Sequence, residues 1–251
     1  MTAITCILPT SPILSNPSTD IIGETIATIR GHLPDAEILL VADGVREEQE
    51  ERRPAYTEYL RRVLWQCSHE WTGVVPLLSA EHVHQSGLVR MALPLVRSEL
   101  VLWCEHDTPL TPDCEIPFDK IAEAIDRGDV SLVRLLHEAH IHPEHGALMV
   151  DEASTDMAGI PIRRTMQFSA RPFVCSTAWL RMLLAHHFSD EARCFLEDRA
   201  YGVIEQAWRE HGRHAWGIWR MGIYEPPGNA KRSYHLDGRA GEPKWDETQK
   251  W

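Results

Sequence analysis

Hydrophobic and polar positions alternate between two patterns in the first half of the chain. Apolar runs of strand length occur at 4–8, 37–42, 74–78 and 99–104. Amphipathic stretches with apolar residues on one helical face separate them, at 16–33, 46–65 and 86–96. This order of strands and helices is typical of a mainly parallel sheet covered on both faces.

Turn and cap residues mark the ends of these elements. Pro9 ends the first strand and Asp43-Gly44 the second, while Pro94 interrupts the third helix. Asn16-Pro17-Ser18 predicts a helix start, with a cap residue followed by proline in the first turn.

The second half of the chain is less regular. The pattern predicts a strand at 130–136, helices at 177–187 and 198–210, and a strand at 215–224. From Glu225 onward proline, glycine and charged residues predominate, which indicates an irregular tail.

Composition limits the classes of protein that fit. The 251 residues carry a formal net charge of -12, which works against loose binding to nucleic acid. No apolar run approaches the ~20 residues that span a bilayer, and the first residues lack the pattern of a signal peptide. The six cysteines form no Cys-x-x-Cys pair, so we expect reduced thiols in a cytoplasmic protein.

Polar residues follow three of the predicted strands at the same relative position. These are Pro9-Thr10, Asp43-Gly44 and Glu105-His106-Asp107. Because parallel sheets bind ligands beyond the carboxyl ends of their strands, we expect one ligand site there.

Several segments together resemble glycosyltransferase family 2, which has the GT-A fold, a Rossmann-like sheet flanked by helices. The departures from the family pattern are Val45, where a serine is usual, and Glu-His-Asp at 105–107 in place of Asp-x-Asp. The segments that carry the resemblance are 4–10, 37–44, 84–90, 99–107, 195–198 and 231–235.

The resemblance implies a single GT-A domain. Residues 1–112 would bind the nucleotide sugar and residues 113–224 the acceptor, with the tail at 225–251 closing over the donor. It also implies a nucleotide-diphosphate sugar as donor, with a UDP-sugar favoured, and Mn²⁺ or Mg²⁺ at the site. A divalent cation stabilises the negative charge that develops on the diphosphate leaving group.

By the same resemblance, Asp107 is a metal ligand and His235 a distant third ligand. Glu105 binds the metal directly, binds it through water, or contacts the donor ribose. Carboxylate oxygen suits Mg²⁺ and Mn²⁺, and Mn²⁺ also accepts an imidazole.

Further donor contacts follow from the resemblance. Asp43 would accept hydrogen bonds from the nucleoside, and Pro9 and Thr10 would shape its pocket. Gly87 precedes Arg90 on the next helix, and Arg90 would approach the diphosphate or support the pocket.

The Glu-Asp pair at 197–198 resembles the pair that supplies the general base. Asp198 would remove the acceptor proton, with Glu197 beside it and in contact with the acceptor. The resemblance implies an inverting single displacement. The acceptor hydroxyl belongs to a glycan, a small molecule or a hydroxylated nucleic-acid base, and the net charge speaks against the last.

Two other functions fit part of the sequence. A sugar nucleotidyltransferase shares the sheet and the acidic metal site, but usually opens with a glycine-rich loop that residues 9–12 lack. A non-catalytic module that binds a sugar nucleotide or carbohydrate is the other alternative.

Two further features of the sequence are a histidine-rich stretch and a group of tryptophans near its end. The histidine-rich stretch at 137–145 lacks the spacing of a zinc protease, and a loop near the acceptor is the simpler interpretation. Of the late tryptophans Trp216, Trp219, Trp245 and Trp251, we expect one or two to line the cleft.

Overall fold

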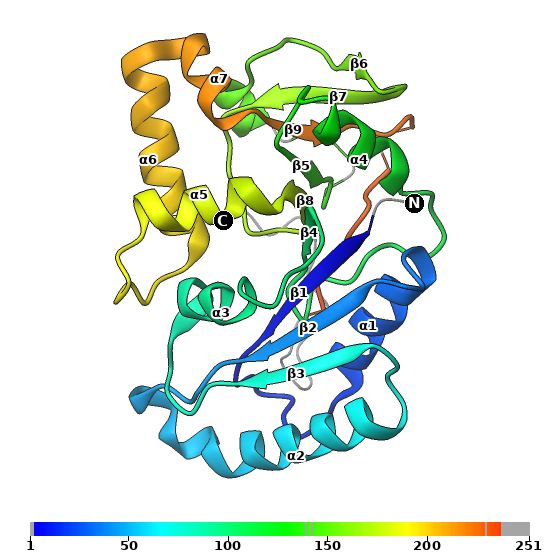
Figure 1. Ribbon diagram of the computed structural model, residues 1–251, viewed down its shortest axis with the longest axis vertical. Helices are drawn as coiled ribbons and strands as arrows, with labels where there is room; N and C mark the ends of the chain where they lie inside the picture. Colours follow the sequence, from blue (N-terminus) through cyan, green and yellow to red (C-terminus); the bar gives the residue numbers. More distant parts are fainter. Residues whose placement is uncertain (1–2, 139, 142, 229, 237–251) are drawn as a thin grey trace.

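A single mixed sheet runs through the molecule (Figure 1). The computed structural model describes residues 3–138, 140–141, 143–228 and 230–236. Within these residues nine strands form the sheet, in the order β3-β2-β1-β4-β8-β5-β9-β7-β6. The strands are β1 (Ile4–Thr10), β2 (Glu37–Ala42), β3 (Val74–Leu78), β4 (Leu100–Trp103), β5 (Leu132–Leu135), β6 (Thr155–Met157), β7 (Ile160–Thr165), β8 (Phe173–Ser176) and β9 (Met221–Tyr224).

The first four strands are parallel, as the sequence predicts. β1 pairs with β2 and β4, and β2 pairs with β3, all in parallel register. Beyond them β8 is antiparallel to both β4 and β5, β9 is parallel to β5, and β7 and β6 are antiparallel to their neighbours. The carboxyl ends of β1, β2 and β4 therefore meet at one edge.

Helices cover both faces of this sheet. Apolar side chains of α1 (Asp20–His32), α2 (Arg53–His69) and α4 (Phe118–Asp126) form one core cluster with the strands. Those of α3 (His84–Ala92), α5 (Thr177–His187) and α6 (Leu196–His211) form the other. The shorter helical elements are η1 (Glu47–Arg52), η2 (Pro143–Leu148), η3 (Gly212–Ala215) and α7 (Trp216–Trp219).

The central strands are apolar throughout because both of their faces are buried. In β2 the side chains of Ile38 and Leu40 join the first cluster, while Leu39 and Val41 join the second. Each such side chain contributes roughly 1.5–3 kcal/mol on burial. All six cysteines are free, as expected.

Three predicted helices begin, divide or end differently in the structure. α1 begins at Asp20 and not at Asn16, because the Asn16 side chain accepts a hydrogen bond from the Ile13 N–H and stabilises a turn instead. The stretch at 46–65 divides into η1 and α2. α3 ends at Ala92, before the proline.

The largest error lies at 215–224, where a single strand is predicted. Only Met221–Tyr224 is strand, and Trp216–Trp219 is a helical turn that ends at Arg220, whose φ of 47° is left-handed. Strands β6, β7 and β8 were not predicted. β6 and β8 are short, and β6 and β7 carry polar residues at half or more of their positions.

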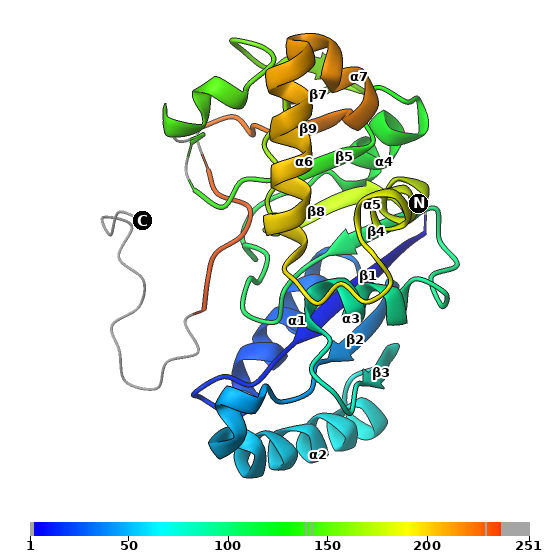
Figure 2. The same ribbon diagram turned by 90° about the vertical axis from the view of Figure 1, so that its left-hand side faces the viewer.

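The described part of the tail returns to the strand ends (Figure 2). The backbone N–H groups of Arg232 and Ser233 donate to the carbonyl of Leu136, and the N–H of Leu236 donates to the carbonyl of Asp107 at 2.7 Å. The chain beyond 236 lies outside the described residues. No helix among the described residues has both the length and the apolar character needed to cross a bilayer.

Candidate active site

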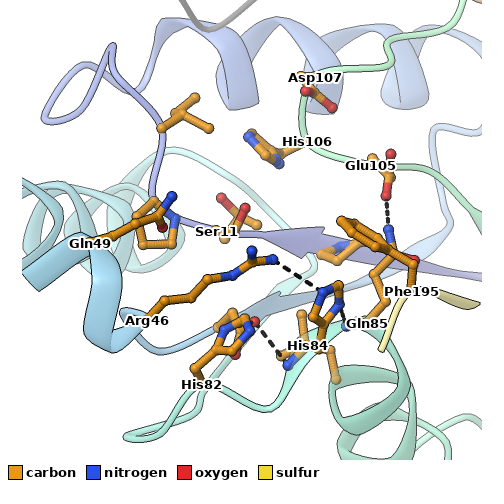
Figure 3. A pocket seen from close by; sticks show the side chains of 16 residues that line it. Ser11, Arg46, Gln49, His82, His84, Gln85, Glu105, His106, Asp107 and Phe195 are labelled. Carbon is orange, nitrogen blue, oxygen red and sulfur yellow. Dashed lines mark hydrogen bonds and ion pairs between the residues drawn. The ribbon is translucent and has the colours of Figure 1, made fainter. Parts of the chain in front are cut away.

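A pocket of about 260 Å³ lies at the carboxyl ends of β1, β2 and β4 (Figure 3). It brings together the three strand-end motifs that the sequence analysis singled out. Its wall includes Pro9, Thr10, Asp43, Glu105 and Asp107.

Asp43 is almost fully buried, and its carboxylate is engaged by the protein itself. Oδ1 accepts hydrogen bonds from the N–H groups of Gly44 (2.9 Å) and Val83 (2.7 Å). Oδ2 accepts from the N–H of His84 (3.0 Å) and lies 2.8 Å from Nδ1 of His82. Three backbone N–H groups thus donate to the two carboxylate oxygens, and the His82 ring lies beside them. Asp43 therefore holds the loop before α3 against the end of β2.

Gly44 is required for the same loop to approach. A Cβ at this position would lie 2.3 Å from the carbonyl carbon of Glu81 and 2.6 Å from the nitrogen of His82. Backbone cannot yield to such a contact, so only glycine fits here.

Glu105, the first residue of the acidic motif, is linked to the start of α6 through Gln85. The side-chain amide of Gln85 donates to Glu105 and accepts from the N–H of Leu196 at 3.0 Å. Burial, followed by the nearby negative charges of Asp107 and Glu197, raises the pKa of the Glu105 carboxyl above its usual value. Three carboxylates thus crowd one region, a situation that a bound cation would relieve.

The tail delivers a histidine to Asp107. Nε2 of His235 lies 3.4 Å from Oδ2 of Asp107. Carboxylate oxygen and imidazole nitrogen form a donor set that fits Mn²⁺. Among the described residues, no group of three or more His, Cys, Asp or Glu side chains could hold a metal ion by itself.

The Glu-Asp pair begins α6, but its two members face different neighbours. Oε2 of Glu197 accepts a hydrogen bond from the N–H of Ala170 at 3.1 Å. The exposed Asp198 has no hydrogen-bond or ion-pair partner among the described residues. Its negative charge acts on His84, which lines the pocket.

Gly87 and Arg90 do not line the pocket. A Cβ at Gly87 would lie 2.5 Å from Cβ of Val83, so this glycine lets α3 start tightly. The guanidinium of Arg90 donates to Asp190 and to the carbonyls of Phe188 and Ser189. Of the two expected roles for Arg90, approach to a diphosphate is corrected to support of the loop between α5 and α6.

The pocket contains functional groups that the sequence analysis did not select. Arg46 crosses it, and Gln49, His82 and His84 lie around the same side (Figure 3). His106 is 7 % exposed, and its Nε2 is buried without a hydrogen-bond partner among the described residues. The positions of Arg46 and Gln49 just after a strand end were the available signal.

Two of the four late tryptophans, Trp216 and Trp219, lie within the described residues. Neither lines the pocket: Trp219 is buried, and Nε1 of Trp216 donates to the carbonyl of Met221. Trp245 and Trp251 lie outside the described residues.

His137 is the first histidine of the 137–145 stretch. Its Nδ1 lies 3.1 Å from Oγ of Ser233, and burial lowers its pKa to about 3, so the ring is neutral. This contact places the stretch beside the tail segment that carries His235.

The arrangement of the sheet and its flanking helices matches the GT-A fold of solved glycosyltransferase structures. No family model matches the sequence, and no curated protein sequence matches it. The fold assignment therefore comes from solved structures.

Three of these show the breadth of the likeness. S. aureus TarS 1-349 in complex with UDP-GlcNAc has a TM-score of 0.56 at 13 % identity, over 96 % of this chain and 60 % of that chain. The Pyrobaculum calidifontis mannosyltransferase PcManGT, with GDP-Man and Mn²⁺, has a TM-score of 0.54 at 15 % identity, over 92 % and 56 %. GalNAc-T7 with UDP, GalNAc and Mn²⁺ has a TM-score of 0.59 at 9 % identity, over 97 % and 46 %. The chain spans less than two thirds of the length of each.

Proposed function

We propose that the protein is a glycosyltransferase that moves a sugar from a nucleotide-diphosphate donor, with UDP-sugars favoured, to an acceptor hydroxyl. The observation that carries the proposal is the pairing of Asp107 with His235 beside a pocket that also holds Asp43 and Glu105, on a GT-A fold. The nucleotide and Mn²⁺ complexes of PcManGT and GalNAc-T7 support the same class of ligand.

Asp107 and His235 would hold Mn²⁺ or Mg²⁺, with Glu105 close to them. When bound, the cation stabilises the charge that develops on the departing diphosphate. Residues 1–112 would bind the donor, and residues 113–224 would bind the acceptor. The tail would supply His235 as the third ligand of the metal ion.

Asp198 would act as the base. Its carboxylate is exposed and without a partner among the described residues, whereas Glu197 already holds the backbone at Ala170. Asp198 would take the hydroxyl proton as the acceptor oxygen attacks the anomeric carbon from the face opposite the nucleoside diphosphate. The bond from that carbon to the diphosphate oxygen breaks in the same displacement, which inverts the configuration without a covalent sugar–enzyme intermediate. The acceptor is a glycan, a small molecule or a hydroxylated nucleic-acid base.

The test is donor turnover by wild type and by Asp107→Asn. With Mn²⁺ and a panel of nucleotide sugars, we expect slow donor hydrolysis by wild type that disappears when the ion is chelated. Asp107→Asn should reduce it by at least about 100-fold, because a ligand to the charge-stabilising ion is lost. The control is Asp113→Asn, an exposed position away from the pocket wall.

Two outcomes would contradict the proposal. Release of pyrophosphate from a nucleoside triphosphate and a sugar-1-phosphate would make the protein a nucleotidyltransferase. Tight donor binding without any turnover, even with a broad panel of acceptors, would make it a binding module.

A further inference from the structure

The pocket carries much negative charge for a site that would bind a diphosphate. Asp43, Glu105 and Asp107 all line it. Among the described residues of its wall, Arg46 is the one arginine or lysine. In the described part of this wall, an anionic ligand would therefore meet one side chain that is permanently positively charged.

In the described part of the chain, Arg46 contacts a histidine ring and not a carboxylate. No carboxylate among the described residues forms an ion pair with it, and its side chain contacts the ring of His84 instead. Nη2 of Arg46 lies 3.1 Å from Nε2 of that ring. Figure 3 shows the side chain reaching across the pocket toward His84.

This contact leaves Arg46 with an unsatisfied hydrogen-bond donor. The N–H of Gln85 points at Nδ1 of the same ring at 3.0 Å. A neutral imidazole has one lone pair, so it can accept from only one of these two donors. The Gln85 amide is fixed at the start of α3, whereas the arginine side chain can turn.

The ring cannot resolve the conflict by taking up a second proton. Burial, the charge of Arg46 and the neighbouring His82 lower the pKa of His84. A charged ring would also present two N–H groups to two donors. The guanidinium is therefore held in the pocket without a good acceptor.

Asp43 strengthens the case because its oxygens are already occupied by the loop at 82–84. With that carboxylate engaged by the loop, Asp43 forms no ion pair with Arg46 in the part of the chain that the structure describes. Guanidinium N–H groups form strong, charge-assisted bonds with phosphate oxygens.

We propose that Arg46 is the protein's own ligand for the diphosphate of the donor, taking the place expected of Arg90. This inference rests on the proposed function and adds a residue to it. When the donor binds, the guanidinium leaves His84 and turns to the phosphate oxygens. Arg46 then acts together with the cation near Asp107.

The test measures binding and needs no turnover. Calorimetry first gives the dissociation constants of UDP and GDP for the wild type. The diphosphate that binds more tightly, and the corresponding nucleoside without phosphates, are then titrated into every variant. Each titration is run with Mn²⁺ and again with chelator. The variants are Arg46→Gln, Arg46→Lys and the control Arg193→Gln, which removes an exposed charge from the adjacent hollow but not from this pocket.

We expect Arg46→Gln to weaken binding of the diphosphate about 10- to 100-fold, as for loss of a hydrogen bond to a charged group. Affinity for the nucleoside should not change. Arg46→Lys keeps the charge but loses the planar fork, so a loss of about three- to tenfold is expected. The loss should persist in chelator, and Arg193→Gln should bind like wild type.

Four results would overturn the inference. One is equal binding by wild type and Arg46→Gln, and another is an equal loss for nucleoside and diphosphate. A loss seen only with the intact nucleotide sugar would assign Arg46 to the sugar. If wild type binds neither diphosphate, the proposed function itself fails and Arg46 loses its role with it. Melting temperatures verify folding, and if Arg46→Gln does not fold, Arg46→Lys decides by the same criteria.

Discussion

The acidic side chains in the pocket and at the start of α6 differ in how many hydrogen bonds they already accept from the protein. Asp43 and Glu197 accept hydrogen bonds from backbone N–H groups, and Glu105 accepts from Gln85. Asp198 is exposed and has no partner among the described residues. A general base must keep a lone pair available for the acceptor proton, so Asp198 is the member of the set that suits this task.

Replacing Asp198 with asparagine should separate catalysis from donor binding. The asparagine cannot take up the acceptor proton, so we expect kcat to fall about 10²- to 10⁴-fold. The dissociation constant of the donor should stay the same. Steady-state kinetics with an acceptor that the wild type glycosylates give kcat, and titration with the donor gives its dissociation constant.

The matched control is Asp190→Asn, an aspartate on the loop before α6 that is 98 % exposed. It should leave kcat within about twofold, as is usual for exposed positions. Full activity of Asp198→Asn would instead assign the base to another carboxylate, with Glu197 the first to test.

Some members of this site were visible in the sequence and others were not. Asp43, Glu105 and Asp107 follow apolar runs, and the position after a strand predicts a shared edge. Arg46 follows the end of β2 and His106 lies within the third strand-end motif, but position alone does not show what their side chains contact. What makes them notable is a missing partner, which depends on every neighbouring side chain.

At the scale of elements, the end of β2 organises the donor side of the pocket. Asp43 ties down the backbone at 83–84, and Gly44 makes room for the backbone at 81–82. The start of α3, with His84 and Gln85, is positioned by these contacts. Sequence patterns predicted the strand and the helix, but not the contact between them.

Asp43→Asn is expected to destabilise the protein. The side-chain NH₂ group of the asparagine would replace one carboxylate oxygen. A backbone N–H that now donates to that oxygen would then face another donor and lose its hydrogen bond. We expect a loss of about 2 kcal/mol in the free energy of unfolding, or roughly 4–8 °C in melting temperature for a chain of this size.

Thermal denaturation of the variant measures this loss, with Asp113→Asn as the exposed control. A melting temperature equal to that of wild type would contradict the loop-holding role. It would mean that the 81–84 backbone finds its place without the carboxylate.

At the scale of the whole molecule, the site joins residues far apart in the chain. His235 reaches Asp107 because the tail pairs with the segment after β4: Leu110 bridges Ser233, and Leu236 donates to the carbonyl of Asp107. The N–H of Tyr234 also donates to the carbonyl of Pro109. The last described residues thus lie beside Asp107, at the ends of strands from the first half of the chain.

His235→Ala should lower the affinity of the site for Mn²⁺ without unfolding the protein, because it removes one proposed metal ligand. We expect the Mn²⁺ concentration that gives half-maximal donor binding to rise about 10- to 100-fold, a range seen when metal-site partners are removed. The melting temperature in chelator should not change, because the imidazole is 41 % exposed.

Titration of donor binding with Mn²⁺ measures this shift. His211→Ala, at the exposed end of α6, serves as the control. An unchanged Mn²⁺ dependence in His235→Ala would remove this histidine from the metal site and leave the carboxylates alone there.

The sequence by itself determined the architecture of the first half and the strand-end position of its acids. Apolar runs and amphipathic periods report burial directly, since a strand covered on both faces must be apolar throughout. Only the tertiary structure decided which polar groups are already satisfied, that Arg90 faces a loop while Arg46 faces the pocket, and that the tail reaches Asp107. Those facts depend on contacts between distant segments, whereas periodicity records only whether a position is buried.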